Sequence, residues 1–217
     1  MEKFLEFMKN DLSSVKEVSL SEIGANKNNT AVIVVDMVKG FYNEGPLANE
    51  KVGEIISDIV RLDKITEDYK KVFFIDSHTE DAKEFNSYPA HCIEGSVETE
   101  LIDELQELSS IKNKNTMIVK KNSVNGFHCN ELKEIIDDES IEKIIVVGVC
   151  TDICVKNFVM SAITYINQFN LDKEIIVPQN MVETFDADFH NREFWNLTSL
   201  FEMKTNGVRI VKDINSK

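Results

Sequence analysis

The sequence predicts an α/β protein in which helices cover both faces of a mostly parallel, six-stranded sheet, as in a three-layer sandwich. Six short runs of consecutive apolar, mostly β-branched residues are typical of strands buried on both faces. Segments with helical spacing of apolar residues separate these runs, and such alternation favours parallel strands joined by right-handed crossovers. The expected strands are 31–35, 72–75, 117–119, 144–147, 174–177 and 208–211.

The helical segments follow from apolar residues that recur every three or four positions. Ahead of the first strand, this spacing predicts an amphipathic helix over about residues 3–17. The helices expected between and after the strands are 52–62, 101–108, 132–136, 153–169 and 193–205. No internal repeat or linker divides the chain, so we expect one Rossmann-like domain over 1–217, with 1–29 as an N-terminal helical extension.

The charge balance excludes several classes of partner. The 217 residues include 24 Lys and Arg against 38 Asp and Glu, a net charge of −14. This argues against a nucleic-acid partner and against an anionic membrane surface, both of which attract basic proteins. No apolar run approaches the ~18 residues that span a bilayer. The N-terminus lacks the pattern of a signal peptide, so we expect a cytoplasmic protein with four free cysteine thiols.

Charged and nucleophilic side chains follow four of the expected strands. They are Asp36, Asp76, Lys121 and Cys154. Ligands of such folds bind beyond the carboxyl ends of the strands, where these side chains would meet. Taken singly, Asp36 could be a turn residue, Lys121 a solvated lysine and Cys154 a small buried residue. Together they supply a base, a cation and a nucleophile.

The turn that carries Cys154 has further features of a reactive site. Cys154 lies where a helix begins, and free N–H groups there lower a thiol pKa and can hold an oxyanion. Cys150 lies four residues earlier in the same turn. Both cysteines also fit the simpler role of buried apolar residues. A redox pair is disfavoured, because a disulfide would have to close across a tight turn.

A second set of residues predicts a metal site. Asp76 and His78 are two residues apart just after a strand, and Glu84 and His91 follow in the next loop. Two imidazoles and a carboxylate suit Zn²⁺, Fe²⁺ or Mn²⁺. The alternative is a polar loop with solvated histidines.

Four segments carry a resemblance to the isochorismatase-like cysteine hydrolases, and among them most to nicotinamidases. They are VIVVDMVKGF, FIDSHTEDAKEFNSYPAHCIEGS, VKKNSVNGF and GVCTDICV. The resemblance covers about residues 30–212 and implies the isochorismatase-like hydrolase fold. Two positions depart from the nicotinamidase pattern: Tyr88 replaces a tryptophan, and Lys39-Gly40 replaces Asn-Asp.

The resemblance implies roles for individual residues. Asp36, Lys121 and Cys154 would be catalytic, with Lys121 chosen over Lys120 by its distance from a following phenylalanine. Backbone N–H groups of Cys150 and Cys154 would form the oxyanion hole, next to a cis peptide before Cys150.

The resemblance also implies how a substrate is held. The ligands of one divalent transition ion would be Asp76, His78, His91 and, as a fourth, Glu84. We expect Zn²⁺ first, with Fe²⁺ or Mn²⁺ as alternatives. Phe41 and Tyr88 would be the ring-stacking walls. His128 and His190 match no catalytic position, and we expect them to be structural or surface residues.

The function expected on this basis is hydrolysis of a linear carboxamide, nicotinamide, to nicotinate and ammonia in NAD salvage. The partner would be this small amide, with a homo-oligomer left open. Two alternatives remain: a hydrolase of the same family that acts on another small amide or on isochorismate, and a non-catalytic family member.

Overall fold

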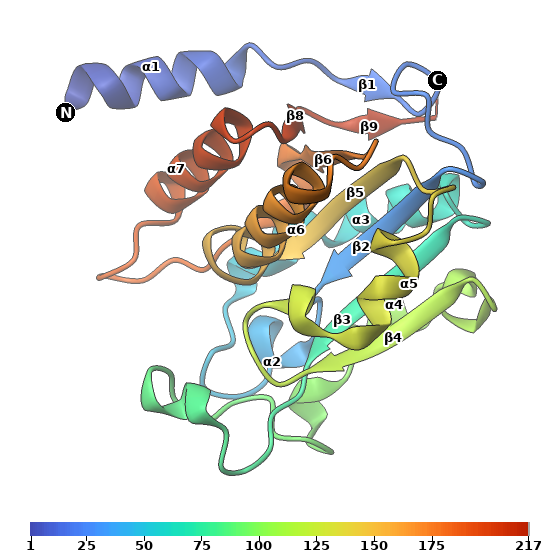
Figure 1. Cartoon of the computed structure of the whole chain (residues 1–217). Coiled ribbons are helices and arrows are strands. Elements are labelled where there is room, and N and C mark those ends of the chain that lie inside the picture. Colours follow the sequence, from blue (N-terminus) through green and yellow to red (C-terminus); the bar gives the residue numbers. More distant parts are fainter. Residues whose placement is uncertain (217) are drawn as a thin grey trace.

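The computed structural model describes residues 1–216 and shows a seven-stranded parallel sheet between two layers of helices (Figure 1). The strand order is β4-β3-β2-β5-β6-β8, and the short β7 pairs with β5. The strands are β2 (Thr30–Val35), β3 (Lys70–Asp76), β4 (Thr116–Lys121), β5 (Lys143–Val149), β6 (Glu174–Pro178), β7 (Val182–Glu183) and β8 (Arg209–Val211). The predicted α/β class and parallel sheet are confirmed.

The sheet divides the apolar core into two parts, and helices cover each part. One part lies under α3 and α4, and the other under α5, α6 and α7. In β2, Val32 and Val34 face the first part, whereas Ala31, Ile33 and Val35 face the second. This explains why residues 31–35 of the strand are all apolar. The helices are α1 (Glu2–Ser13), α2 (Lys39–Tyr42), α3 (Ile56–Ile65), α4 (Asp103–Gln106), α5 (Lys133–Ile136), α6 (Lys156–Phe169) and α7 (Arg192–Thr205).

The structure corrects the expected strand number and the expected N-terminal extension. The seventh strand, β7, has two residues, too few to produce a sequence pattern. The helix α1 ends at Ser13 rather than near residue 17. The rest of the predicted helical extension, residues 14–29, includes a strand: β1 (Val18–Ser19) pairs in parallel with β9 (Ile214–Asn215) in a separate two-stranded sheet. The N-terminal segment is therefore hydrogen-bonded to the C-terminal segment.

Other helix boundaries also differ from the prediction. Only Asp103–Gln106 of the expected helix 101–108 is α-helical. A 3₁₀ turn, Glu50–Ile55, precedes α3. The helix expected from residue 153 begins with a π-helical turn, Thr151–Val155, which continues into α6. These differences lie at helix ends, where periodicity is least informative.

The strand order brings the predicted functional residues to one edge of the sheet. Four neighbouring strands, beginning with β4 at the edge and followed by β3, β2 and β5, end at Lys121, Asp76, Val35 and Val149, respectively. Asp36 follows β2 with a left-handed backbone (φ 50°), which aspartate tolerates better than most residues. Parallel strands point their carboxyl ends the same way, so the side chains at these strand ends lie at the same edge of the sheet.

Gly148 allows β5 to approach β2 closely just before the site. Its φ of 117° suits only glycine, and a Cβ there would collide with the carbonyl oxygen of Val35. Val35 immediately precedes Asp36. The spacing of β2 and β5 at the site therefore depends on residue 148 having no side chain.

We expect Gly148→Ala to lower the free energy of unfolding by about 3 kcal/mol or more, because backbone strain and collision add. Gly207→Ala is the matched control: Gly207 also has a positive φ (98°), but a Cβ there meets no atom within 4 Å. It should cost about 1 kcal/mol. Urea unfolding followed by circular dichroism measures both. Equal losses in the two variants would contradict the close approach at Gly148.

Candidate active site

A buried lysine ammonium lies between two buried carboxylates at the edge of the sheet. The Nζ atom of Lys121 is 2.8 Å from Oδ2 of Asp36 and 2.6 Å from Oδ1 of Asp76. The same Nζ is 3.9 Å from the Sγ atom of Cys154. The four side chains are almost fully buried. The structure therefore brings together the base, cation and nucleophile that the sequence predicted.

The charges in this cluster shift its proton affinities. Burial raises the pKa of Asp36 to about 7, against the opposing effect of Lys121. Burial also raises the pKa of the Cys154 thiol well above its usual value, again opposed by Lys121. Burial lowers the pKa of Lys121, but Asp36, Cys154 and Asp76 together raise it by more. These shifts favour a charged Lys121 ammonium and a weakly acidic Asp36 carboxyl.

The turn before α6 places two cysteines on the same side of the site. The peptide bond between Val149 and Cys150 is cis, as the resemblance implies. The carbonyl oxygen of Cys150 accepts hydrogen bonds from the N–H groups of Ile153 and Val155, both at 3.1 Å. Burial raises the pKa of the Cys150 thiol to about 12, so this cysteine stays protonated. Both Cys150 and Cys154 are free thiols.

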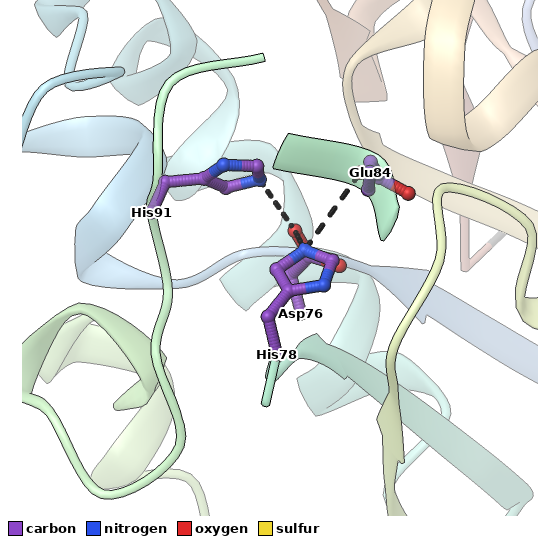
Figure 2. Close-up of side chains that lie close together, drawn as sticks. All are labelled: Asp76, His78, Glu84 and His91. Atoms are coloured by element: carbon purple, nitrogen blue, oxygen red, sulfur yellow. Dashed lines mark hydrogen bonds and ion pairs between the residues drawn. The ribbon is translucent and has the colours of Figure 1, made fainter. Parts of the chain in front are cut away.

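Next to this cluster, four side chains converge on a small volume (Figure 2). They are Asp76, His78, Glu84 and His91, and each offers a ligand atom within 4.8 Å of the others. The Oδ2 atom of Asp76 is 2.9 Å from Nε2 of His78 and 3.1 Å from Nε2 of His91. The Oε1 atom of Glu84 is 3.7 Å from Nε2 of His78. Asp76 belongs to both clusters, with one oxygen in each.

The hydrogen bonds around the imidazoles favour a cation between them. Nδ1 of His91 donates to the carbonyl oxygen of Pro89 at 2.7 Å. Nδ1 of His78 donates to Oδ1 of Asn122 at 3.1 Å. With the protons on Nδ1, the Nε2 lone pairs of both histidines face the carboxylate of Asp76. A cation bound between them would remove the repulsion between these electron pairs.

Two further observations show that these residues fit a metal ion. The Oε1 atom of Glu84 is buried without a hydrogen-bond partner among residues 1–216, whereas its Oε2 accepts from the N–H group of Val124 at 2.9 Å. Burial lowers the pKa of His78, but Asp76, with Asn122 and Glu84, raises it by more, so the carboxylates attract positive charge at this point. Two imidazoles with two carboxylates suit a divalent transition ion.

A pocket of about 240 Å³ opens onto both clusters. Its inner end is formed by Asp76, Glu84, His91, Cys150 and Cys154. The predicted walls Phe41 and Tyr88 line it, with ring centroids 5.7 Å and 6.3 Å from that of His91. The other lining residues are Pro46, Leu47, Ala48, Asn49, Val52, Val124, Ile153, Phe185, Asp186, Ala187 and Phe189.

All the predicted site residues thus lie at one place, and Lys120 does not. The Lys120 side chain is 59% exposed and pairs with Glu94 at 2.7 Å. The residues that the sequence analysis missed are the loop walls at 46–52 and 185–189, and Asn122. Only Asn122 carried a local signal, because it directly follows the lysine at the end of β4.

Comparison with known proteins agrees with this arrangement. A family model described as the isochorismatase domain matches residues 30–206. The chain belongs to the isochorismatase-like hydrolase family. This family assignment and the nicotinamidase-like resemblance are both confirmed.

The similar proteins include nicotinamidases. The chain is 30% identical over 216 residues to Nicotinamidase 1 of Arabidopsis thaliana, covering 87% of each protein. A pyrazinamidase/nicotinamidase from Streptococcus mutans has a similar structure, with a TM-score of 0.73, 22% identity, and coverage of 84% of this chain and 100% of that one. A pyrazinamidase of Pyrococcus horikoshii in complex with zinc gives a TM-score of 0.67, 22% identity, and coverage of 85% and 99%.

Within residues 1–216, no helix has the length and apolar character that crossing a bilayer requires.

The metal cluster is tested by composition. We expect purified protein to contain close to one divalent transition ion per chain, and His91→Ala to lose it, because that variant removes a ligand. His128→Ala is the control, since His128 lies outside the cluster. Elemental analysis by mass spectrometry measures the ion. Full metal content in the His91 variant would contradict this ligand set.

Proposed function

We propose that the protein is a metal-assisted cysteine amidohydrolase that converts nicotinamide to nicotinate and ammonia. The observation that carries the proposal is the position of Asp76, whose two oxygens join the nucleophile cluster to the metal-ligand cluster. One pocket thus offers a nucleophile for a carboxamide and a cation site for a ring nitrogen. The 30% identical Nicotinamidase 1 supports the choice of substrate.

In the first half of the reaction, Asp36 takes the proton from Sγ of Cys154, and the Lys121 ammonium stabilises the thiolate. The sulfur attacks the amide carbon, and the electron pair of the C=O bond moves to oxygen. N–H groups of Cys150 and Cys154 stabilise this oxyanion. The C–N bond breaks as Asp36 returns the proton to nitrogen, so ammonia leaves and a thioester remains.

In the second half, water hydrolyses the thioester. Asp36 takes a proton from the water, and the resulting hydroxyl attacks the carbonyl carbon. The C–S bond then breaks, the acid is released, and the proton returns to Cys154. A base with a pKa of about 7 suits both halves, because it can accept and return a proton near neutral pH.

The remaining residues orient the substrate. When bound, a divalent ion held by Asp76, His78, Glu84 and His91 would supply a Lewis acid for the ring nitrogen; we propose Zn²⁺ in that role. The rings of Phe41 and Tyr88 hold the faces of the pyridine. We propose that the product acid enters pyridine nucleotide salvage in the cytoplasm.

The charge of the pocket argues against anionic substrates such as isochorismate. Among the described residues, no lysine or arginine lines the pocket, whereas Asp76, Glu84 and Asp186 do. A substrate carboxylate would therefore find no lysine or arginine side chain at the pocket wall, whereas a neutral amide needs none.

The proposed activity is tested by ammonia release from nicotinamide, with pyrazinamide and benzamide in parallel. Benzamide lacks the ring nitrogen and should be the poorest substrate. We expect Lys121→Met to lower kcat by roughly 10³-fold, because the members of a catalytic unit depend on one another. Lys120→Met is the matched control and should keep its activity. Equal losses at Lys120 and Lys121 would rule out the assigned cation, and no turnover by the wild type would rule out the function.

The pH dependence tests the base. Asp36 must be ionised to accept the thiol proton, so activity is lost as pH falls through its raised pKa of about 7. We expect kcat/KM for nicotinamide to rise about tenfold between pH 6 and pH 8, then level off. Steady-state rates in buffers of constant ionic strength measure this. A flat profile across that range would contradict the role of Asp36.

A further inference from the structure

Outside the catalytic cluster, three side chains form a second buried polar group. Oδ1 of Asp152 accepts a hydrogen bond from Oγ1 of Thr184 at 2.6 Å. Oδ2 of Asp152 lies 3.0 Å from Nε2 of His190. Nδ1 of His190 faces the carbonyl oxygen of Phe185, also at 3.0 Å. Both ring nitrogens therefore face oxygen atoms.

Two aromatic rings enclose His190. The Phe185 ring stacks on it with centroids 3.8 Å apart and planes 15° apart. The Trp195 ring also lies nearly parallel to it, with centroids 5.4 Å apart and planes 13° apart. An imidazole that contacts oxygen atoms through both nitrogens and stacks with neighbouring rings is held in both position and orientation.

This group joins two elements that form the pocket. Asp152 belongs to the Thr151–Val155 turn, two residues before Cys154. Phe185 and its neighbours 186, 187 and 189 form one wall of the pocket. The wall is otherwise exposed: Phe189 at its tip is 87% exposed.

Other contacts also fasten this wall. Backbone hydrogen bonds of 3.0 Å and 2.9 Å between Ala187 and His190 close its tip into a tight turn. The amide of Asn49 donates to the carbonyl oxygen of Asp186 at 3.1 Å, and the N–H group of Arg192 donates to Oδ1 of Asp186 at 3.1 Å, both at exposed positions. The Cys150 thiol lies in hydrogen-bonding contact with Thr184 and the backbone of Phe185, so two links join the wall to the nucleophile turn, one through Cys150 and one through Asp152.

We propose that Asp152, Thr184 and His190 act as a polar clamp that holds the 185–189 wall against the nucleophile turn. Asp152 and His190 are then positioning residues for substrate binding. His190 holds Phe185 at the pocket wall through the contact of its Nδ1 with the Phe185 carbonyl oxygen and through ring stacking. Loss of the clamp weakens binding of the substrate ring more than it slows the chemistry, since Asp36 and Lys121 follow or end other strands. The kinetic part of this inference rests on the proposed nicotinamidase activity.

The kinetic test compares KM with kcat for nicotinamide. We expect His190→Ala and Asp152→Ala each to raise KM at least tenfold and to change kcat less than threefold. The double variant should be no worse than the single ones, because both changes open the same clamp. His128→Ala is the matched control. A fall in kcat at constant KM, or KM effects that multiply, would overturn the proposal.

The conservative variant separates the clamp from a general loss of stability. In Asp152→Asn, the amide oxygen still accepts from Thr184, and the amide nitrogen can donate to Nε2 of a neutral His190. The bond from Nδ1 to Phe185 survives, so we expect Asp152→Asn to stay within threefold of the wild-type KM. A KM as high as that of Asp152→Ala would contradict this. Should Asp152→Ala fail to fold, Thr184→Val removes one donor and should raise KM about threefold.

A second measurement needs no substrate. Trp195 is the single tryptophan of the chain, and its ring covers His190. We expect acrylamide to quench Trp195 fluorescence at least twice as strongly in Asp152→Ala as in the wild type. In Asp152→Asn, quenching should equal that of the wild type. Unchanged quenching in Asp152→Ala would overturn the clamp whatever the substrate. If quenching behaves as expected but nicotinamide is not hydrolysed, the proposed function fails and the clamp stands.

Discussion

The Lys121 ammonium, buried between Asp36 and Asp76, is the interaction on which the rest of the site depends. Two carboxylates buried side by side would repel each other, and the positive charge of Lys121 neutralises one of their two negative charges. One excess negative charge remains. It contributes to the raised pKa of Asp36, and it favours a cation on the far oxygen of Asp76. The same lysine lies against the proposed base, approaches the proposed nucleophile and connects them to the candidate metal ligands.

The sheet supplies the precision that this interaction requires. Lys121 and Asp76 end neighbouring strands in register, and Asp36 follows the next strand. Gly148 lets β5 come close to β2 just before the turn that carries Cys154. Rigid strands thus position the reacting groups. Loops that extend beyond them form the pocket, so the ring of the substrate is recognised by more adaptable parts of the chain.

Much of the fold and of the candidate site could be predicted because parallel sheets impose simple rules. A strand buried on both faces is apolar along its length, as in residues 31–35 of β2, and polar residues at its carboxyl end then stand out. Asp36 and Asp76 are of this kind, whereas Lys121 ends the partly exposed edge strand β4, and Cys154 lies five residues after the end of β5. The two-residue strands β1, β7 and β9 left no pattern. The wall at 185–189 could not be predicted, because tertiary contacts such as that of Asp152 with His190 determine its position.

The central claim is that Lys121 sets the reactivity of Cys154, and the rate at which iodoacetamide alkylates Cys154 tests it most directly. Mass spectrometry identifies the modified cysteine, and the rate is measured against pH in the wild type and in the Lys121→Met and Lys120→Met variants. Loss of the ammonium should reduce the thiolate fraction. We therefore expect about 100-fold slower alkylation of Lys121→Met at pH 7, with its profile moved to higher pH, and no change in Lys120→Met. Alkylation of Lys121→Met at the wild-type rate would contradict the account.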